Sequence, residues 1–407
     1  MADRRFESFD LGPTIASPPP AFSFEKVKDA FEPAVSDVLT KLSEPIRGSA
    51  RIATLDIALA IPDLQSPSCR PIGKVFAQLQ QYLTSIYTLV GATAAARDVE
   101  LDSPGGIDTR VLFLDPSTAA DALLSQAIVG DLGFGPVFGL HSLATSGRRW
   151  DHLWYPNIEA GKTLATSFAH SLGSQVGSHL ESSLDAVSSS SSWTVPGPLL
   201  TPEPTAATPH YSVIVGGTFD HLHLGHKLLL TALALSLEPA TPADKHQQRI
   251  LAAGVTGDAL LVNKKYADYL ESWEDRFQNT ATFLRAIMSS SGNVTPRLDR
   301  TTAPGPNGNF VVVTVQPNLS FKFTEIWDPF GPTITEENLT ALVVSKETAS
   351  GGAAVNAERN KKGWKSLAIL EVDVLQAGEA TDVTGSNFDG KISSTDIRRR
   401  RMNLAKV

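Results

Sequence analysis

Apolar side chains recur along this chain with two alternating periods. From Phe24 to Leu42 they fall three or four positions apart, which predicts an amphipathic helix that Pro33 should bend or split. Short apolar runs and helical patterns then take turns, with strands expected at 51–61 and 110–114 and helices at 72–90 and 118–129. This alternation favours an α/β domain in the N-terminal half.

The same alternation returns beyond residue 210. Strands are expected at 211–215, 249–255, 310–315, 339–345 and 367–374, and helices at 224–237, 273–288 and 353–361. Strands and helices in turn imply a mostly parallel sheet that is covered on both faces. The fold class predicted for the chain is therefore α/β, with a parallel sheet in the C-terminal domain.

Two stretches interrupt this pattern and set the domain boundaries. Residues 1–21 run into three consecutive prolines and are predicted to be a flexible tail. Residues 182–209 are rich in serine and proline, a composition typical of a linker. The remaining chain falls into an N-terminal α/β domain of unknown role at 22–181 and a C-terminal domain at 210–407.

Composition narrows the classes of protein further. There are 35 Lys and Arg against 43 Asp and Glu, and the net charge of −8 argues against nucleic acid or a membrane surface as a general partner. No run of about 18 apolar residues predicts a membrane span, and the first residues do not form a secretory signal. The single cysteine, Cys69, fits a reducing compartment. We expect a cytoplasmic protein, with a nuclear pool as an alternative.

The strongest chemical pattern follows the first strand of the C-terminal domain, where residues 216–226 read GGTFDHLHLGH. Gly216 and Gly217 would let the backbone approach a ligand closely, since neither has a Cβ. Thr218 adds a hydroxyl next to Phe219. Histidines at 223 and 226 lie three apart at the start of a helix, where unpaired N–H groups attract anions. The pattern predicts a phosphate-binding clamp.

A metal site made of His221, His223 and His226 is an alternative interpretation of the same residues. Zinc sites use histidines at helical spacing, but they normally add a carboxylate or thiolate ligand and would leave the preceding glycines unexplained. We therefore predict no dedicated metal ligands here.

The turn resembles the T/HxGH signature of the nucleotidylyltransferase superfamily, in which both histidines contact the nucleotide phosphates. Residues 392–398, ISSTDIR, are similar to the ISSTxIR motif of the same superfamily. Ser393, Ser394 and Thr395 would begin a helix whose N-terminus binds an anion. Arg398 would then neutralise the β- and γ-phosphates of a nucleotide. The resemblance implies a Rossmann-like nucleotidyltransferase domain.

Three further segments resemble the eukaryotic phosphopantetheine adenylyltransferases. The block VVSKET at 343–348, followed by Gly351, Gly352, Asn356 and Arg359, matches their VSxET…GG…N…R pattern. Lys264 and Lys265 follow the second strand, as lysines do in that family. The segment WDPFGP at 327–332 matches the position of their DPYGP-like segment.

This resemblance implies adenylyl transfer from ATP to 4′-phosphopantetheine, with Mg²⁺ entering together with ATP. Thr218 and either Lys264 or Lys265 would orient the phosphate nucleophile, and His223 and His226 would contact the ATP phosphates. A further phosphate-binding residue would be Arg359. Other enzymes of coenzyme A biosynthesis are the expected protein partners.

Two other functions remain open at this point. One is a different nucleotidylyltransferase that acts on nicotinamide mononucleotide or on an alcohol phosphate with CTP, and the other is an inactive regulatory homologue. The tripeptide Gly161-Lys162-Thr163 ends like a P-loop, but the glycine required five residues earlier is Pro156. We therefore predict an adenylyltransferase without a fused kinase activity.

Overall fold

The protein is described here by a computed structural model. It describes residues 8–16, 23–101, 104–117, 135–173, 184–190, 199–204, 207–239, 246–288, 297–301, 307–316, 318–375 and 393–404. The helix predicted at 118–129 lies outside these residues. Among the described helices, none is both long and apolar enough to cross a membrane.

The chain divides into two compact units. The first contains Met1–Arg70, Gln81–Pro204 and Ile287–Asn293, and the second contains Pro71–Gln80, Thr205–Ala286 and Val294–Val407. This division differs from the predicted domain boundaries at two places. Residues 71–80 group with the C-terminal part, and Ile287 and Met288 at the end of α7 group with the N-terminal part.

The first unit is built on a six-stranded parallel sheet with the order β4-β3-β2-β1-β5-β6. Its strands are β1 (Ser8–Ala16), β2 (Ile52–Ala60), β3 (Ile107–Asp115), β4 (Val137–Gly139), β5 (Leu153–Pro156) and β6 (Leu184–Val187). The strands β2 and β3 confirm the two predicted in this half. Every residue of β2 after Ile52 is buried, as in a strand covered on both faces.

Two predictions about irregular segments are wrong in part. Residues 8–16, expected to be a flexible tail, form β1 between β2 and β5, and the register of β1 shifts across Pro13, which cannot donate a backbone hydrogen bond. The expected linker at 182–209 begins with β6, which pairs with β5 at the edge of the sheet. Backbone pairing with a neighbouring strand orders both segments, and local composition does not report it.

Helices of the first unit are α1 (Phe24–Ser43), α2 (Phe76–Ala96), α4 (Leu140–Ala144) and α5 (Glu159–Gly173). The Ser23 side chain caps α1 by accepting a hydrogen bond from the Lys26 N–H. Pro33 was predicted to bend or split this helix, and the structure contradicts the split, because α1 continues through it. The buried side chains of α1, including Val27, Phe31 and Leu39, hold the helix against the core on both sides of the proline.

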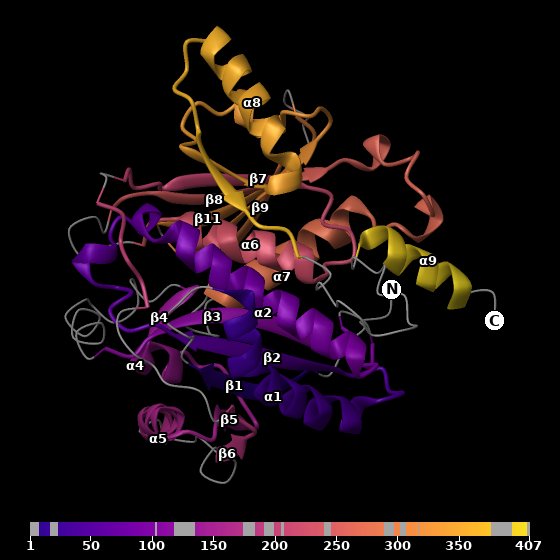
Figure 1. Cartoon of the computed structure of the whole chain (residues 1–407). Helices are drawn as coiled ribbons and strands as arrows, with labels where there is room; N and C mark the ends of the chain where they lie inside the picture. Colours follow the sequence, from indigo (N-terminus) through magenta and orange to yellow (C-terminus); the bar gives the residue numbers. More distant parts are fainter. Residues whose placement is uncertain are drawn as a thin grey trace. The chain divides into compact units, whose positions relative to one another are not determined.

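The second unit is built on a seven-stranded sheet with the order β13-β12-β7-β8-β11-β10-β9 (Figure 1). Its strands are β7 (Ser212–Gly217), β8 (Arg249–Thr256), β9 (Arg297–Thr301), β10 (Phe310–Gln316), β11 (Leu319–Ile326), β12 (Ala341–Ser345) and β13 (Ala368–Val372). Five strands are parallel, and β10 and β9 extend one edge antiparallel. A mixed α/β fold with parallel sheets is therefore confirmed for the described residues.

The chain reverses its direction of growth across this sheet at β7. From β7 it proceeds to β8 on one side and later returns to place β12 and β13 on the other side. In open parallel sheets, ligands bind outside the carboxyl ends of the strands at such a reversal. The topology thus singles out the carboxyl ends of β7 and β12.

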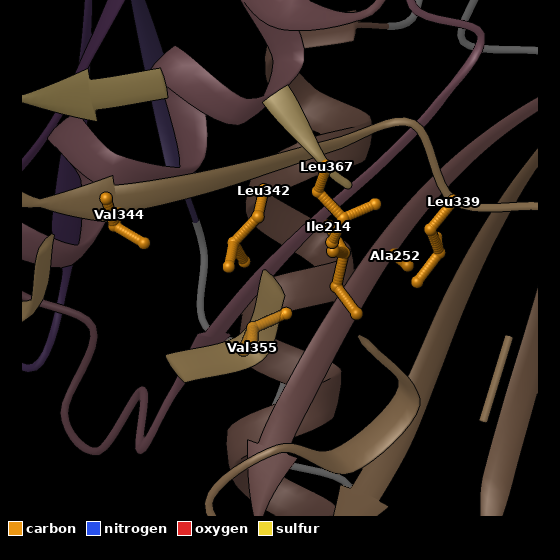
Figure 2. Packing of buried hydrophobic residues seen from close by; sticks show 7 residues of the cluster. All are labelled: Ile214, Ala252, Leu339, Leu342, Val344, Val355 and Leu367. Carbon is orange, nitrogen blue, oxygen red and sulfur yellow. The ribbon is translucent and has the colours of Figure 1, made fainter. Parts of the chain in front are cut away.

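Helices cover both faces of this sheet. They are α6 (Leu224–Ser236), α7 (Trp273–Met288), α8 (Ala349–Lys361) and α9 (Ser394–Leu404), with α8 on one face and α6 and α7 on the other (Figure 1). In Figure 2, Ile214 of β7 lies among Leu342 of β12, Val355 of α8 and Leu367. Burial of these apolar side chains fixes α8 against β7 and β12, the two strands whose carboxyl ends the topology singles out.

Candidate active site

The turn after β7 has an unusual backbone. Phe219 and His221 adopt positive φ angles of 54° and 47°, which are rare for residues with a Cβ. A Cβ on Gly217 would lie 2.8 Å from the Phe219 ring, so this position requires glycine. A Cβ on Gly216 would meet nothing within 4 Å. The two glycines therefore differ in role. Gly217 leaves room for the Phe219 ring, and Gly216 leaves open space beside the backbone.

The two histidines of the motif lie together at the start of α6. Their ring centroids are 3.9 Å apart and their planes are 23° from parallel. His223 is the N-cap residue, and its Nδ1 accepts a hydrogen bond from the Gly225 N–H. His226 Nδ1 has no hydrogen-bond partner in the described part of the chain. The pair thus contains one buried ring nitrogen without a partner among the described residues.

Burial keeps both rings neutral. It lowers the pKa of His226 from 6.5 to about 4, and it places the pKa of His223 well below its ordinary value. Repulsion from a protonated His226 and from Lys227 lowers the pKa of His223 further, and repulsion from a protonated His221 acts on both rings. At neutral pH the rings can therefore donate or accept hydrogen bonds without carrying charge. An incoming polyphosphate would favour the protonated forms.

Asp220 contacts several of the residues that hold the turn. It is fully buried, its Oδ1 accepts a hydrogen bond from the Glu271 N–H at 2.9 Å, and its Oδ2 forms an ion pair with Arg398. Glu271 in turn accepts a 2.7 Å hydrogen bond from the His221 N–H. These contacts hold the strained residues of the turn in place.

The C-terminal motif packs on this same turn. Ser393 accepts a hydrogen bond from the Asp396 N–H and so caps α9, while the Ser394 hydroxyl donates to the Asp220 carbonyl at 2.8 Å. The Arg398 guanidinium reaches Asp220, the Lys265 carbonyl and the Thr395 hydroxyl. The structure therefore brings the two predicted motifs together. Arg398 is buried and its Nε, Nη1 and Nη2 all donate to protein groups, so in this structure it supports the turn.

Arg276 is the second residue that supports the turn, and no sequence motif marks it. Its guanidinium is fully buried and donates to the Thr218 carbonyl at 2.7 Å, to the Glu271 carbonyl and to Asp258. A single arginine in the first turn of α7 has no motif around it. Only its burial and its partners reveal the role.

The two candidate lysines are both exposed. Lys265 contributes its backbone carbonyl to Arg398, and neither ammonium group is held by a contact that would distinguish one from the other. The choice between Lys264 and Lys265 therefore stays open.

The prediction that Arg359 binds phosphate is contradicted by its surroundings. The side chain is fully buried, and its guanidinium donates to the carbonyls of Lys365, Thr333, Glu336, Glu337 and Leu339. Asn356 in the same motif block pairs with both backbone groups of Leu367. These two motif residues fasten the loop before β12 and the strand β13 to α8.

A cavity of about 220 Å³ opens at the carboxyl ends of the strands beside the turn. Its walls are mostly apolar and come from four strands, the 329–333 segment and α8. They include Gly216, Ile214, Phe330, Val344, Ser345, Thr348 and Gly351. The Ser345 and Thr348 hydroxyls lie 3.0 Å apart at its edge. An apolar cavity with a few hydroxyls suits a flat heteroaromatic group.

Asp328 fixes the segment that forms one wall of the cavity. Its Oδ1 accepts hydrogen bonds from the Phe330 and Gly331 N–H groups. Gly331 has a φ of 50°, and a Cβ there would lie 2.4 Å from Ile326. The motif at 327–332 therefore encodes the shape of a cavity wall.

The three-histidine metal interpretation does not fit this geometry. His221 Nε2 lies 2.8 Å from the Tyr269 carbonyl and its Nδ1 lies 3.4 Å from Glu271, whereas His223 and His226 stack on each other. Ligand atoms of Asp220, His221 and Glu271 do gather within 4.8 Å. Asp220 is already paired with Arg398, and Glu271 with His221, so the cluster acts as a hydrogen-bond network.

Comparison with known proteins finds one family model and several similar proteins. A family model described as a domain of unknown function (DUF8446) matches residues 14–193. A phosphopantetheine adenylyltransferase of Thermococcus kodakarensis is 30% identical over 186 residues, which are 46% of this chain and 83% of that protein. The chain belongs to the phosphopantetheine adenylyltransferase family.

Two fungal proteins are similar over a comparable length. An uncharacterized protein of Schizosaccharomyces pombe is 33% identical over 191 residues, and a phosphopantetheine adenylyltransferase of Saccharomyces cerevisiae is 31% identical over 196 residues. These matches cover 47% and 48% of this chain, and 48% and 50% of the two fungal proteins. The chain thus spans about half the length of these two relatives. Membership of the family makes it a nucleotidyltransferase homologue.

Proposed function

We propose that this protein transfers the adenylyl group of ATP to 4′-phosphopantetheine. A phosphate oxygen of the acceptor attacks the α-phosphorus of ATP, and the bond from that phosphorus to the bridging oxygen of the β-phosphate breaks. Dephospho-CoA and pyrophosphate leave. The nucleophile is already an anion, so the protein needs to position the two substrates and stabilise charge.

The observation that carries this proposal is the stacked, neutral pair of His223 and His226 at the start of α6, next to an apolar cavity at the reversal point of the sheet. The adenine ring would enter the cavity. His226 offers its unpaired Nδ1 to the phosphates, and the helix N-terminus adds backbone N–H groups. Relatives named for the same activity support the choice of acceptor.

Thr218 and one of the two lysines would orient the acceptor phosphate. The Thr218 backbone is held by Arg276, which leaves its hydroxyl on a fixed part of the turn. Lys264 and Lys265 are exposed on the segment that Arg398 fastens to the same turn. A mobile ammonium group could reach a phosphate that arrives from solvent.

Mg²⁺ would come with ATP and reduce the charge of its phosphates. The two carboxylates that contact the turn, Asp220 and Glu271, are already paired with Arg398 and His221. The residues around the turn therefore fit an ion held by ATP and water, rather than by protein carboxylates.

Pyrophosphate release by the purified full-length chain tests this proposal. ATP with 4′-phosphopantetheine should support release, and CTP or nicotinamide mononucleotide in place of the matching substrate should not. Release that requires CTP, or that occurs with nicotinamide mononucleotide and not with phosphopantetheine, would assign another nucleotidyltransferase activity. Absence of release with every pair would favour a regulatory homologue.

A further inference from the structure

A short segment from the N-terminal half is part of the second unit. Residues 71–80 include a 3-10 turn at Ile72–Lys74 and the first turn of α2, and both group with the C-terminal residues. Ile72, Val75 and Leu79 are buried there. A Cβ on Gly73 would lie 3.3 Å from the Ala207 side chain. The transferase unit therefore includes chain that precedes it by more than a hundred residues.

The first attachment of this segment is made to the end of α6. The Ile72 N–H donates a 2.9 Å hydrogen bond to the Glu238 carboxylate, which is 6% exposed. Glu238 follows the last turn of the helix whose first turn carries His226. This hydrogen bond to a buried carboxylate links residue 72 to the end of α6.

The second attachment is made to the end of β13. Gln80 donates from its Nε2 to the Asp373 carboxylate at 3.0 Å, and its Oε1 accepts from the Asp373 N–H at 3.0 Å. Gln80 is 6% exposed, so both bonds are shielded from water. A paired amide of this kind fixes the backbone of Asp373 as well as its side chain.

Asp373 also reaches the edge of the nucleotide cavity. Its carboxylate forms an ion pair with Lys346, which directly follows the cavity-lining Ser345. The same contact raises the pKa of Lys346. Gln80, Asp373 and Lys346 thus form a continuous chain of contacts from the first turn of α2 to the carboxyl end of β12.

We propose that residues 71–80 act as a brace that positions the nucleotide cavity, with Gln80 and Asp373 as its positioning residues. The brace gives residues 71–80 a role in nucleotide binding, although they precede β7 by more than a hundred positions. Its effect on ATP rests on the proposed function. Its effect on the order of β12 and β13 does not.

Hydrogen exchange on the full-length chain tests the brace without ATP. Gln80→Ala should speed amide exchange in residues 341–348 and 368–373, while β8 exchanges as in the wild type. Gln81→Ala, the same substitution at the next position of the helix, is the matched control and should leave both segments unchanged. Equal exchange in Gln80→Ala and wild type would overturn the brace.

Calorimetric titration with ATP then measures the link to binding. Gln80→Ala should weaken ATP binding by about 5- to 10-fold, in the range of typical coupling between sites, with kcat nearly constant. Asp373→Ala should do the same, and the double variant should add little to either, since both single changes remove one interaction.

The outcomes separate the two proposals. If the wild type does not bind ATP, the proposed function fails and hydrogen exchange still decides the brace. If the wild type binds ATP and Gln80→Ala binds it equally well, the link from the brace to the nucleotide is wrong. Additive effects of Gln80→Ala and Asp373→Ala would also contradict it, because independent residues would then be responsible.

Discussion

Arg398 and Asp220 form a buried ion pair, although 178 positions separate them in the sequence. Arg398 lies on the helix α9 near the C-terminus, and Asp220 lies in the turn that leads to the two stacked histidines. The pair therefore fixes the relation between the two sequence motifs. It also means that substitution of either residue acts first on the shape of the turn.

Removal of Arg398 should destabilise the second unit. Arg398→Ala leaves the Asp220 carboxylate buried without its partner, which typically costs about 3–5 kcal/mol of unfolding free energy. Denaturant unfolding followed by fluorescence measures this loss. Asp220→Asn/Arg398→Ala is the matched control and should recover part of the stability, because no buried charge remains. A stable Arg398→Ala protein with reduced affinity for pyrophosphate would instead favour direct phosphate binding.

The stacked histidines should be needed for turnover more than for folding. His226→Ala removes the ring whose Nδ1 faces no protein partner, and we expect kcat to fall by at least about 10²-fold, as for other groups that stabilise a transition state. Thermal unfolding should change little. Steady-state kinetics with both substrates measures the effect, and a smaller loss of kcat would argue against a role in the transition state.

The pH dependence follows from the low pKa of His226. Its imidazole should titrate near pH 4 in the free protein, against 6.5 in an unfolded chain. Between these values the unfolded state binds a proton that the folded state does not, so this residue lowers stability as pH falls from 6.5 to 4 and has no effect above that window. NMR titration of labelled histidine checks the value. A midpoint near 6.5, absent in His226→Gln, would show that the ring is hydrated. Saturating ATP should raise the midpoint.

Arg359 should matter for folding and not for ATP affinity. Arg359→Lys cannot satisfy the five carbonyls that now receive the guanidinium, and each buried acceptor left unpaired costs about 1–3 kcal/mol. Urea unfolding should show the loss, while KM for ATP of the folded protein stays within about twofold of the wild type. A large rise in KM at unchanged stability would restore the phosphate-binding role.

Gly351 and Gly352 offer a matched pair for the cavity. A Cβ at Gly351 meets nothing within 4 Å and the residue lines the cavity, whereas a Cβ at Gly352 would lie 3.0 Å from Ile369. Gly351→Leu should therefore raise KM for ATP by about tenfold or more with no loss of stability, since helical glycine is itself unfavourable. Gly352→Ala should lower stability instead. The two measurements are substrate kinetics and thermal unfolding, and a Gly351→Leu enzyme with wild-type KM would exclude nucleotide from this cavity.

Local pattern predicted much of the fold. Strands and helices with clear periodicity, such as β7, β8, α6 and α7, were expected close to their observed bounds, because side-chain alternation records which face is buried. The strand β11 was missed, although its residues Leu319, Phe321 and Phe323 alternate inward. The edge strand β6 and the central strand β1 were missed because pairing with distant strands creates them.

The sequence by itself determined where a candidate phosphate site is expected. A glycine pair, two histidines and a serine-rich helix start are short motifs, and each has a local physical reason to be near an anion. Only the tertiary structure decided what the charged residues do. A guanidinium looks the same in a motif whether it faces a phosphate, as was expected of Arg359, or five carbonyls, as it does. The positioning roles of Arg276, Glu271 and Gln80 are visible only in the tertiary structure for the same reason. Their partners lie on other elements, and no spacing along the chain encodes them.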